Sequence, residues 1–184
     1  MQTSADPLTS EQTLNVWMNQ HYAFIYRLAY SILDNADDAD DAAQQAFINA
    51  GLHLDEFAGR SSPRTWLAAI AINLCRAELR RRRVRLAVGR SLGALTRLWG
   101  KPSSAESNAL ENERRGQLLL EVQKLDEKHR LPLLLRYVHN LPAAEIATIL
   151  GISEGTVHSR LHNARSQLAG QLARLGEDFQ EAAQ

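Results

Sequence analysis

The 184-residue sequence has a single cysteine, no apolar run long enough to span a bilayer, and no early basic-then-apolar stretch resembling a signal peptide. The lone cysteine, Cys75, excludes an internal disulfide and favours a reducing compartment. Without a signal peptide or a membrane span, the chain is expected to be cytoplasmic. The sequence also lacks the alternating pattern of strands, and it has no internal repeat. Hydrophobic residues still make up 45% of the chain, which is enough for a core and argues against wholesale disorder.

The formal net charge of +0 conceals a strong segregation of charge along the chain. Residues 1–59 carry a balance of −8, residues 60–101 a balance of +10, and the remainder a balance of −2. An acidic block followed by a basic block indicates two different partners, one basic and one polyanionic. Overall neutrality is therefore no argument against nucleic-acid binding.

Helical periods account for the first half of the chain. Thr9 and Gln12 have capping-box spacing, and Asn35 is placed to cap a second helix. Ser62 before Pro63 marks the start of a third helix, which is expected to end in the arginines at 80–83. The expected inner faces are Leu14, Trp17, Ile25, Leu28 and Ile32 on the first helix, Ala39, Ala43, Ala46, Phe47 and Ala50 on the second, and Trp66 or Leu67, Ile70, Leu74 and Ala77 on the third, with Cys75 as a partly buried filler.

The second half begins with a weakly patterned stretch, predicted to be a linker, whose apolar residues 92–99 could form a short docking helix. Helices are expected at about 110–125, 130–139 and 142–150. Gly151 suits the left-handed residue of a turn, and Ser153 can cap a final helix. The apolar positions of that helix are Val157, Leu161, Ala164, Leu168, Leu172 and Leu175. A short helix, a glycine turn and a second helix predict a helix-turn-helix, whose second helix can enter the major groove of DNA.

Particular motifs in both halves resemble one known family. The run Gly-Thr-Val-His-Ser-Arg-Leu at 155–161 resembles domain four of the extracytoplasmic-function (ECF) sigma factors. The run Asp-Asp-Ala-Asp-Asp at 37–41 is similar to the acidic helix with which sigma domain two binds RNA polymerase, and Phe-Ala-Gly-Arg-Ser-Ser-Pro at 57–63 is similar to its DNA-melting segment. Ala69 and Ile72 stand where family members often carry basic residues, and Arg76 is one turn further along.

The resemblance implies an all-α fold of two small helical domains joined by a flexible linker: domain two over residues 8–84, the linker over 85–111 and domain four over 112–175. It implies a sigma factor that binds core RNA polymerase, recognises −10 and −35 promoter elements and directs transcription initiation under some inducing stress. The expected partners are the polymerase clamp, promoter DNA and an anti-sigma factor, possibly membrane-anchored. No enzyme activity, cofactor or metal is expected. The alternative is a two-domain helix-turn-helix regulator that acts on duplex DNA without forming a holoenzyme.

Three sets of residues are predicted to make these contacts, by resemblance and by the chemistry of their side chains. The polymerase-binding set is Asp37, Asp40, Asp41, Gln44 and Phe47. The −10 set is Phe57, Arg60, Ser61, Ser62, Asn73, Arg76, Arg80, Arg81, Arg82 and Arg83, with Arg85 as a further phosphate contact. The −35 set is Thr156, His158, Ser159, Arg160, His162, Asn163 and Arg165.

Simpler or different roles remain open for some of these residues. The acidic cluster could be no more than a solvated helix start, or an Asp-Asp-x-x-Asp magnesium motif formed by Asp37, Asp38 and Asp41. Ser62 could serve only as a helix cap. The spacing of Glu154, His158 and His162 could place metal ligands on one face of the last helix.

Overall fold

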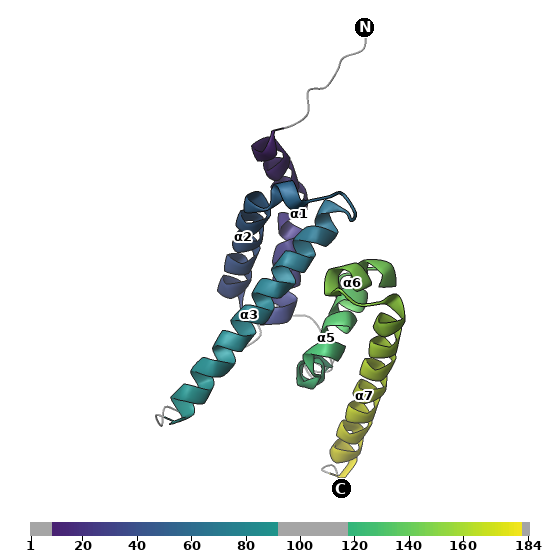
Figure 1. The fold of residues 1–184 in the computed structure, drawn as a ribbon. Coiled ribbons are helices and arrows are strands. Elements are labelled where there is room, and N and C mark those ends of the chain that lie inside the picture. The colour runs from purple at the N-terminus through teal and green to yellow at the C-terminus, as the bar shows by residue number, and fades with distance from the viewer. Residues whose placement is uncertain (1–8, 92–117, 182–184) are drawn as a thin grey trace, which may run out of the picture. The chain divides into compact units, whose positions relative to one another are not determined.

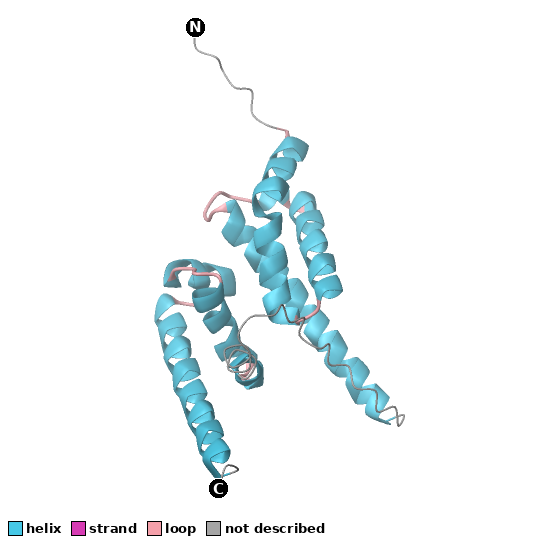
Figure 2. Cartoon of the chain, turned by 180° about the vertical axis from the view of Figure 1, so that it is seen from behind, coloured by secondary structure: helices cyan, strands magenta, loops and turns pink. Residues whose placement is uncertain are grey.

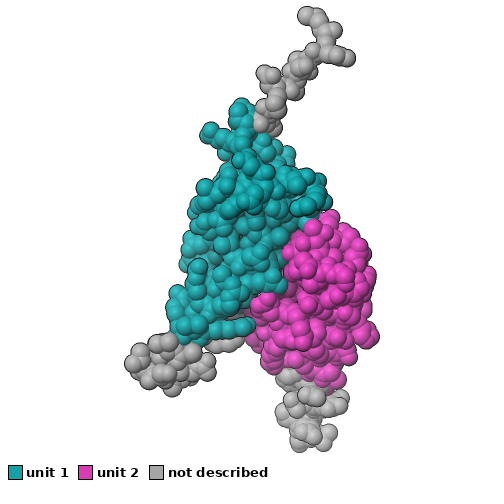
Figure 3. Space-filling view, in the orientation of Figure 1, with its two compact units in different colours: residues 1–99 teal, residues 100–184 magenta. Residues whose placement is uncertain are grey.

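The computed structural model describes the backbone of residues 9–91 and 118–181, and the side chains of residues 9–85 and 118–173. All regular structure in these ranges is helical (Figures 1 and 2). The chain divides into two compact units, residues 1–99 and residues 100–184 (Figure 3). The expectation of an all-α chain with two helical domains is therefore confirmed. The apolar segment 92–99 and the linker beyond residue 91 lie outside the described residues.

Over residues 9–91, the first unit has three α-helices that all contact one another, α1 (Ser10–Leu33), α2 (Ala36–Leu52) and α3 (Pro63–Ser91), and a short 3-10 helix, η1 (Leu54–Glu56), between α2 and α3. The predicted caps are present. Thr9 and Gln12 form the reciprocal capping box at α1, and the Asn35 side chain accepts a hydrogen bond from the Asp38 amide at α2. These side chains satisfy amides that have no partner inside the helix, so each helix begins where the sequence predicts.

The core of this unit combines large side chains from α1 with small ones from α2. Trp17, Ile25, Leu28 and Ile32 are buried on α1, whereas Leu14 is only half-buried. The alanines of α2 and Phe47 are buried, as expected. Small residues on α2 let its backbone approach its neighbours closely, and the larger α1 side chains fill the space between the helices.

The buried face of α3 differs from the predicted one. Leu67 is buried, but the others that pack inward are Thr65, Ala68, Ala71, Ile72 and Cys75. The predicted Ile70, Leu74 and Ala77 are half-buried, and so is Trp66. Cys75 is fully buried, and this burial raises the pKa of its thiol to about 12. The helix also continues to Ser91, past the arginines that were expected to end it and past residue 84, the predicted end of domain two.

The second unit contains a helical turn at residues 118–124, then α5 (Glu127–Leu133), the π-helical segment η2 (Leu134–Val138), α6 (Ala143–Leu150) and α7 (Glu154–Glu181). Asp126 caps α5 by accepting a hydrogen bond from the His129 amide, so this helix begins three residues before the predicted start at 130. Gly151 has φ +65°, the left-handed conformation predicted for the turn. The Ser153 hydroxyl accepts a hydrogen bond from the Thr156 amide and caps α7.

The predicted helix-turn-helix is thus formed by α6, the turn at Gly151 and α7. Val157, Leu161, Ala164 and Leu168 are buried on α7, but Leu172 is exposed and Leu175 lies beyond the described side chains. Among the described side chains of α7, the buried stripe thus runs from Val157 to Leu168. Across the described parts of the chain, no helix combines the length and apolarity needed to traverse a lipid bilayer.

Candidate functional site

The acidic helix α2 presents a mixed charged and apolar face to solvent. Asp37, Asp41 and Gln44 are exposed. Ile48 and Leu52, which sequence reasoning missed, are 55% and 76% exposed on the same side of the helix. Residues spaced by three and four share one helix face, and exposed aliphatic residues at such positions are the signal that could have revealed them. This surface, formed by Asp37, Asp41, Gln44, Ile48 and Leu52, is called the α2 face.

Asp40 is engaged within the unit rather than free on that face. Its carboxylate accepts hydrogen bonds from the Tyr22 hydroxyl at 2.6 Å and from the Gln44 amide at 2.7 Å. Burial, with the hydrogen bond to Asp40, raises the pKa of Tyr22, so the hydroxyl remains a donor. The Tyr22 ring stacks on Phe47 with ring centroids 5.8 Å apart. Phe47 is only 3% exposed, in line with its predicted place on the inner face of α2, and its contact with polymerase stays a prediction.

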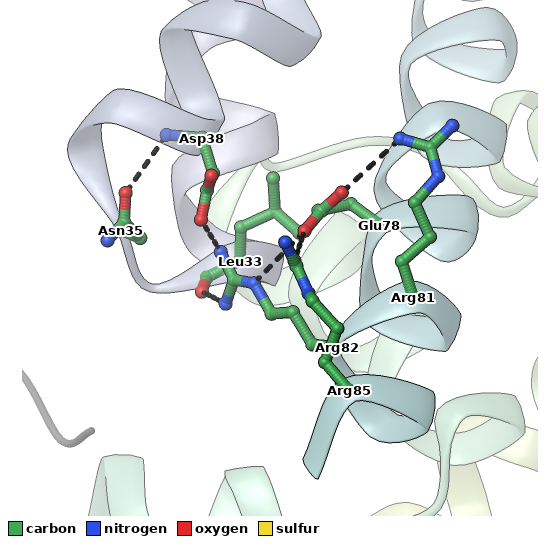
Figure 4. A network of polar contacts seen from close by, with 7 residues as sticks. All are labelled: Leu33, Asn35, Asp38, Glu78, Arg81, Arg82 and Arg85. Carbon is green, nitrogen blue, oxygen red and sulfur yellow. Dashed lines mark hydrogen bonds and ion pairs between the residues drawn. The ribbon is translucent and has the colours of Figure 1, made fainter. Parts of the chain in front are cut away.

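Asp38 has a structural partner on the far helix of the unit. Its carboxylate forms an ion pair with Arg82 of α3, and Arg82 also donates to the Leu33 carbonyl at 2.9 Å (Figure 4). Leu33 is the last residue of α1, whose terminal carbonyls have no partner within the helix. Arg82 thereby joins the end of α1 and the start of α2 to α3.

The remaining arginines of the run differ in their surroundings. Glu78, on the same helix, contacts Arg81 at 3.4 Å, Arg82 at 3.6 Å and Arg85 at 2.5 Å (Figure 4). Arg80 and Arg83 are exposed. The predicted phosphate-binding cluster is therefore not uniform: Arg82 is held inside the fold, and Arg81 and Arg85 are paired on its surface.

The loop before α3 rests on three packed aromatic rings. Phe57 lies 5.0 Å from Trp17 and 5.2 Å from Trp66, measured between ring centroids, and is half-buried. Arg60 is exposed and Ser61 half-buried. The Ser62 hydroxyl accepts a hydrogen bond from the Thr65 amide at 3.1 Å, so Ser62 does cap α3. Phe57 packs on Trp17 and Trp66 and so supports the loop, whereas Arg60 and Ser62 are exposed and Ser61 is half-buried.

Asn73 and Arg76 lie further along α3. Asn73 is exposed and accepts a long hydrogen bond from Arg76 at 3.4 Å. Asn73 also lines a groove of about 400 Å³ with Asn49, His53, Glu56, Trp66, Ile70 and Leu74. The half-buried apolar residues of α3 thus form the floor of an open groove rather than part of the core.

On α7, the predicted −35 residues are divided by their position around the helix. Ser159, His162 and Asn163 are exposed opposite the buried stripe, and His158 is exposed at one edge of that side. Arg165 is exposed on one flank of the buried stripe, and half-buried Arg160 lies on the other. Thr156 is half-buried, and its hydroxyl is hydrogen-bonded to Ser153 at 2.9 Å. Polar groups that suit base edges thus lie between two flanking guanidinium groups that suit phosphates.

The two metal-binding alternatives gain no support from this geometry. Over residues 9–85 and 118–173, no group of three or more His, Cys, Asp or Glu side chains converges on a point where a metal ion could be held. Asp38 is instead occupied by Arg82.

Comparisons with known protein families match both units. Residues 17–85 match the model described as Sigma-70 region 2, and residues 115–168 match the one described as Sigma-70, region 4. The chain is 32% identical over 154 residues to the ECF RNA polymerase sigma factor SigW of Bacillus subtilis, covering 80% of this chain and 82% of SigW. It is 32% identical over 161 residues to the ECF RNA polymerase sigma factor SigL of Mycobacterium tuberculosis, covering 86% of this chain and 88% of SigL.

Solved structures of similar fold include two chains at 22% sequence identity. The sigma factor RpoE from Bartonella quintana, in complex with the anti-sigma factor NepR, has a TM-score of 0.66 and covers 88% of this chain and 97% of its own. CnrH, in complex with the cytosolic domain of CnrY, has a TM-score of 0.64 and covers 89% of this chain and 90% of its own. At this identity the likeness is one of fold.

Proposed function

The chain belongs to the ECF family of RNA polymerase sigma factors, and from this membership we propose how its surfaces divide the work of promoter recognition. As a sigma factor it binds core RNA polymerase and directs promoter-specific transcription initiation. The observation that best supports the division is the position of two polar surfaces: the α2 face in the first unit and the exposed side of α7 in the second.

The α2 face is proposed to bind the clamp of core polymerase. Asp37 and Asp41 supply charge, Gln44 supplies hydrogen-bonding groups, and Ile48 with Leu52 supplies apolar area beside them. Charged contacts set the register of such an interface, while the apolar residues contribute the area removed from water. Asp40 acts through its hydrogen bond to Gln44, which it holds in place.

The DNA contacts are proposed to come from three places. Arg60, Ser61 and Asn73 lie where unpaired bases of the −10 element would be read, with Phe57 as a support. Arg76, Arg80 and Arg83, with Arg81 and Arg85, contact phosphates without sequence preference. Ser159, His162 and Asn163, with His158 at their edge, read the −35 element between phosphate contacts from Arg160 and Arg165.

Location and chemistry follow from these partners. A protein that acts with polymerase and promoter DNA works in the bacterial cytoplasm, and we place this chain there. Its role is recruitment and recognition, so we propose no catalytic activity, cofactor or metal of its own.

The test of the polymerase surface is the variant Asp41→Ala with Gln44→Ala. These side chains are exposed, so helical content should be unchanged while affinity for core polymerase falls by at least about thirtyfold, as expected for a charged, hydrogen-bonded interface. Gln45→Ala, an exposed change on the same helix, is the matched control and should bind normally. Binding is measured with purified core polymerase, followed by runoff transcription on a promoter library. Unreduced binding by the double variant would contradict the surface assignment, and failure of the unaltered chain to support transcription would contradict the function itself.

We further propose that a cognate anti-sigma factor restrains this chain. The support is that the sigma factor RpoE was solved in complex with the anti-sigma factor NepR, and CnrH, of similar fold, in complex with the cytosolic domain of CnrY. Affinity capture from cells in several growth states should recover an inhibitory partner in competition with polymerase. Recovery of polymerase alone in every state would count against it.

A further inference from the structure

Glu78 is the only acidic residue between positions 60 and 101, and it lies within the arginine run of α3. Its side chain is only 19% exposed, because guanidinium groups surround it. Three of them share its carboxylate: Arg81, Arg82 and Arg85 (Figure 4). Two carboxylate oxygens facing three arginines are the arrangement in which a phosphate group would also be held.

The three arginines are not equally committed to this carboxylate. Arg82 is 28% exposed and bound to Asp38 and the Leu33 carbonyl as well, so it stays with the fold. Arg81 and Arg85 are 72% and 68% exposed, and Glu78 is the acidic group that each contacts. Most of each side chain is exposed, and a guanidinium group has five N–H donors, so a phosphate of the DNA backbone could reach donors that Glu78 does not use.

We infer that Glu78 is an internal competitor of DNA phosphate for Arg81 and Arg85, and that it lowers the affinity of the sigma factor for promoter DNA. This inference rests on the proposed phosphate contacts of the arginine run. The arginine side of each of these two pairs is exposed, and ion pairs at a protein surface are weak and screened by salt, so DNA can draw Arg81 and Arg85 away from Glu78 without unfolding the helix. The displaced carboxylate then remains close to the bound phosphate, and this repulsion limits how tightly any sequence is held. Such a restraint on sequence-blind binding leaves more of the discrimination to the base-reading residues.

The test is Glu78→Gln in the full-length chain, assembled with core polymerase and titrated with promoter DNA and with promoter-free duplex from about 50 to about 300 mM salt. Glutamine keeps the size of the side chain and one acceptor oxygen, but removes the charge. Both DNAs should bind about threefold to tenfold more tightly at the lowest salt, and the slope of log affinity against log salt should steepen by up to about one unit. Glu11→Gln, an exposed change of equal charge at the start of α1, should alter affinity less than about twofold.

A double-mutant cycle separates displacement of arginines from simple repulsion. Glu78→Gln is repeated in a chain that carries Arg81→Ala and Arg85→Ala, and its gain in affinity should then nearly vanish. An unchanged affinity for Glu78→Gln in the original chain, or an undiminished gain in the altered one, would overturn the inference. Loss of both arginines without any weakening of DNA binding would instead overturn the proposed phosphate contacts. Because Glu78 also touches Arg82, thermal unfolding of each variant is recorded, and binding is measured well below every midpoint.

Discussion

Arg82 lies in the arginine run of the sequence, but its contacts hold the helices of the first unit together. It satisfies a terminal carbonyl of α1 at Leu33 and pairs with Asp38 in the first turn of α2. Asp38 is favourably placed there because a carboxylate stabilises the positive end of a helix. The Arg82 guanidinium group therefore ties the turn between α1 and α2 to α3.

Replacing Arg82 by Ala should destabilise the first unit rather than selectively weaken DNA binding. The change leaves Asp38 and the Leu33 carbonyl without this donor, which should reduce the free energy of unfolding by about 1–3 kcal/mol. Arg83→Ala is the matched control, since Arg83 is exposed one residue later, and its effect on stability should stay within about 0.5 kcal/mol. Urea denaturation followed by circular dichroism measures both.

The ranking of the two variants should reverse for DNA binding: Arg83→Ala should weaken promoter binding directly, whereas Arg82→Ala should act mainly on stability. Arg83→Ala should lower the salt slope of promoter binding by about one unit, alike for all sequences. Equal stability of the two variants would contradict the structural role of Arg82, and an altered base preference in Arg83→Ala would contradict its assignment to phosphate.

The caps of this protein were predictable from sequence, whereas the partner of Arg82 was not. Thr9, Asn35, Ser62 and Ser153 each bond an amide three residues away, so the signal and its effect are local. Arg82 and Asp38 are 44 residues apart, and no local pattern reports which of several neighbouring arginines faces another helix. The burial of Phe47, by contrast, was predicted from the local apolar period of α2.

Helix α3 has apolar residues on more than one side, so the sequence alone does not determine which side is buried. Its two candidate stripes, one through Ile70 and Leu74 and one through Ala68 and Ile72, have the same spacing. The second is buried. The alanine-rich face of α2 leaves room for close approach, so small residues on α3 pack there while larger ones line the groove beside Asn73.

Its length was also underestimated, because a run of arginines was interpreted as a helix end. Arginine is a good helix former, and cations are favourable in the last turns of a helix, so the run itself does not stop α3. Glu78 adds support within the helix through contacts three and four residues away.

Helix α7 carries the prediction about base recognition. Replacing Asn163 by Ala should cost about 1–3 kcal/mol in binding to the preferred −35 sequence and relax discrimination at about one base pair, because an amide side chain contacts a base edge with two hydrogen-bonding groups. Ser166→Ala, also exposed on α7, is the matched control and should preserve base preference. Holoenzyme affinity is measured across all single changes of the −35 element. A uniform loss of affinity in Asn163→Ala would reassign this residue to phosphate contact.

Over the entire chain, acidic and basic residues are segregated along the sequence, but the acidic and basic segments pack together within the first unit. The acidic block supplies α2 and the basic block supplies α3, and these helices pack against each other. The Asp38–Arg82 pair lies where the two blocks meet. A surface for a protein partner and a surface for a polyanion can therefore face solvent on the same small bundle, while the charges between them are neutralised internally.

Cys75, fully buried in this bundle, should be inert to thiol reagents in the folded protein. Burial raises the pKa of its thiol to about 12, so almost none of the reactive thiolate is present at neutral pH. Alkylation by iodoacetamide at pH 7.5 should be at least about a hundredfold slower than in urea, as measured by mass spectrometry. Rapid labelling of the native chain would contradict this protection.

The burial of Cys75 bears on whether this sigma factor can itself sense oxidation through a thiol. The chain has no second cysteine with which to form a disulfide, and its only one is buried, with a thiol whose pKa is raised to about 12. If a promoter served by this sigma factor responds to oxidation through thiol chemistry, the reactive thiols therefore belong to another molecule. The sigma factor would then receive that signal through a binding partner.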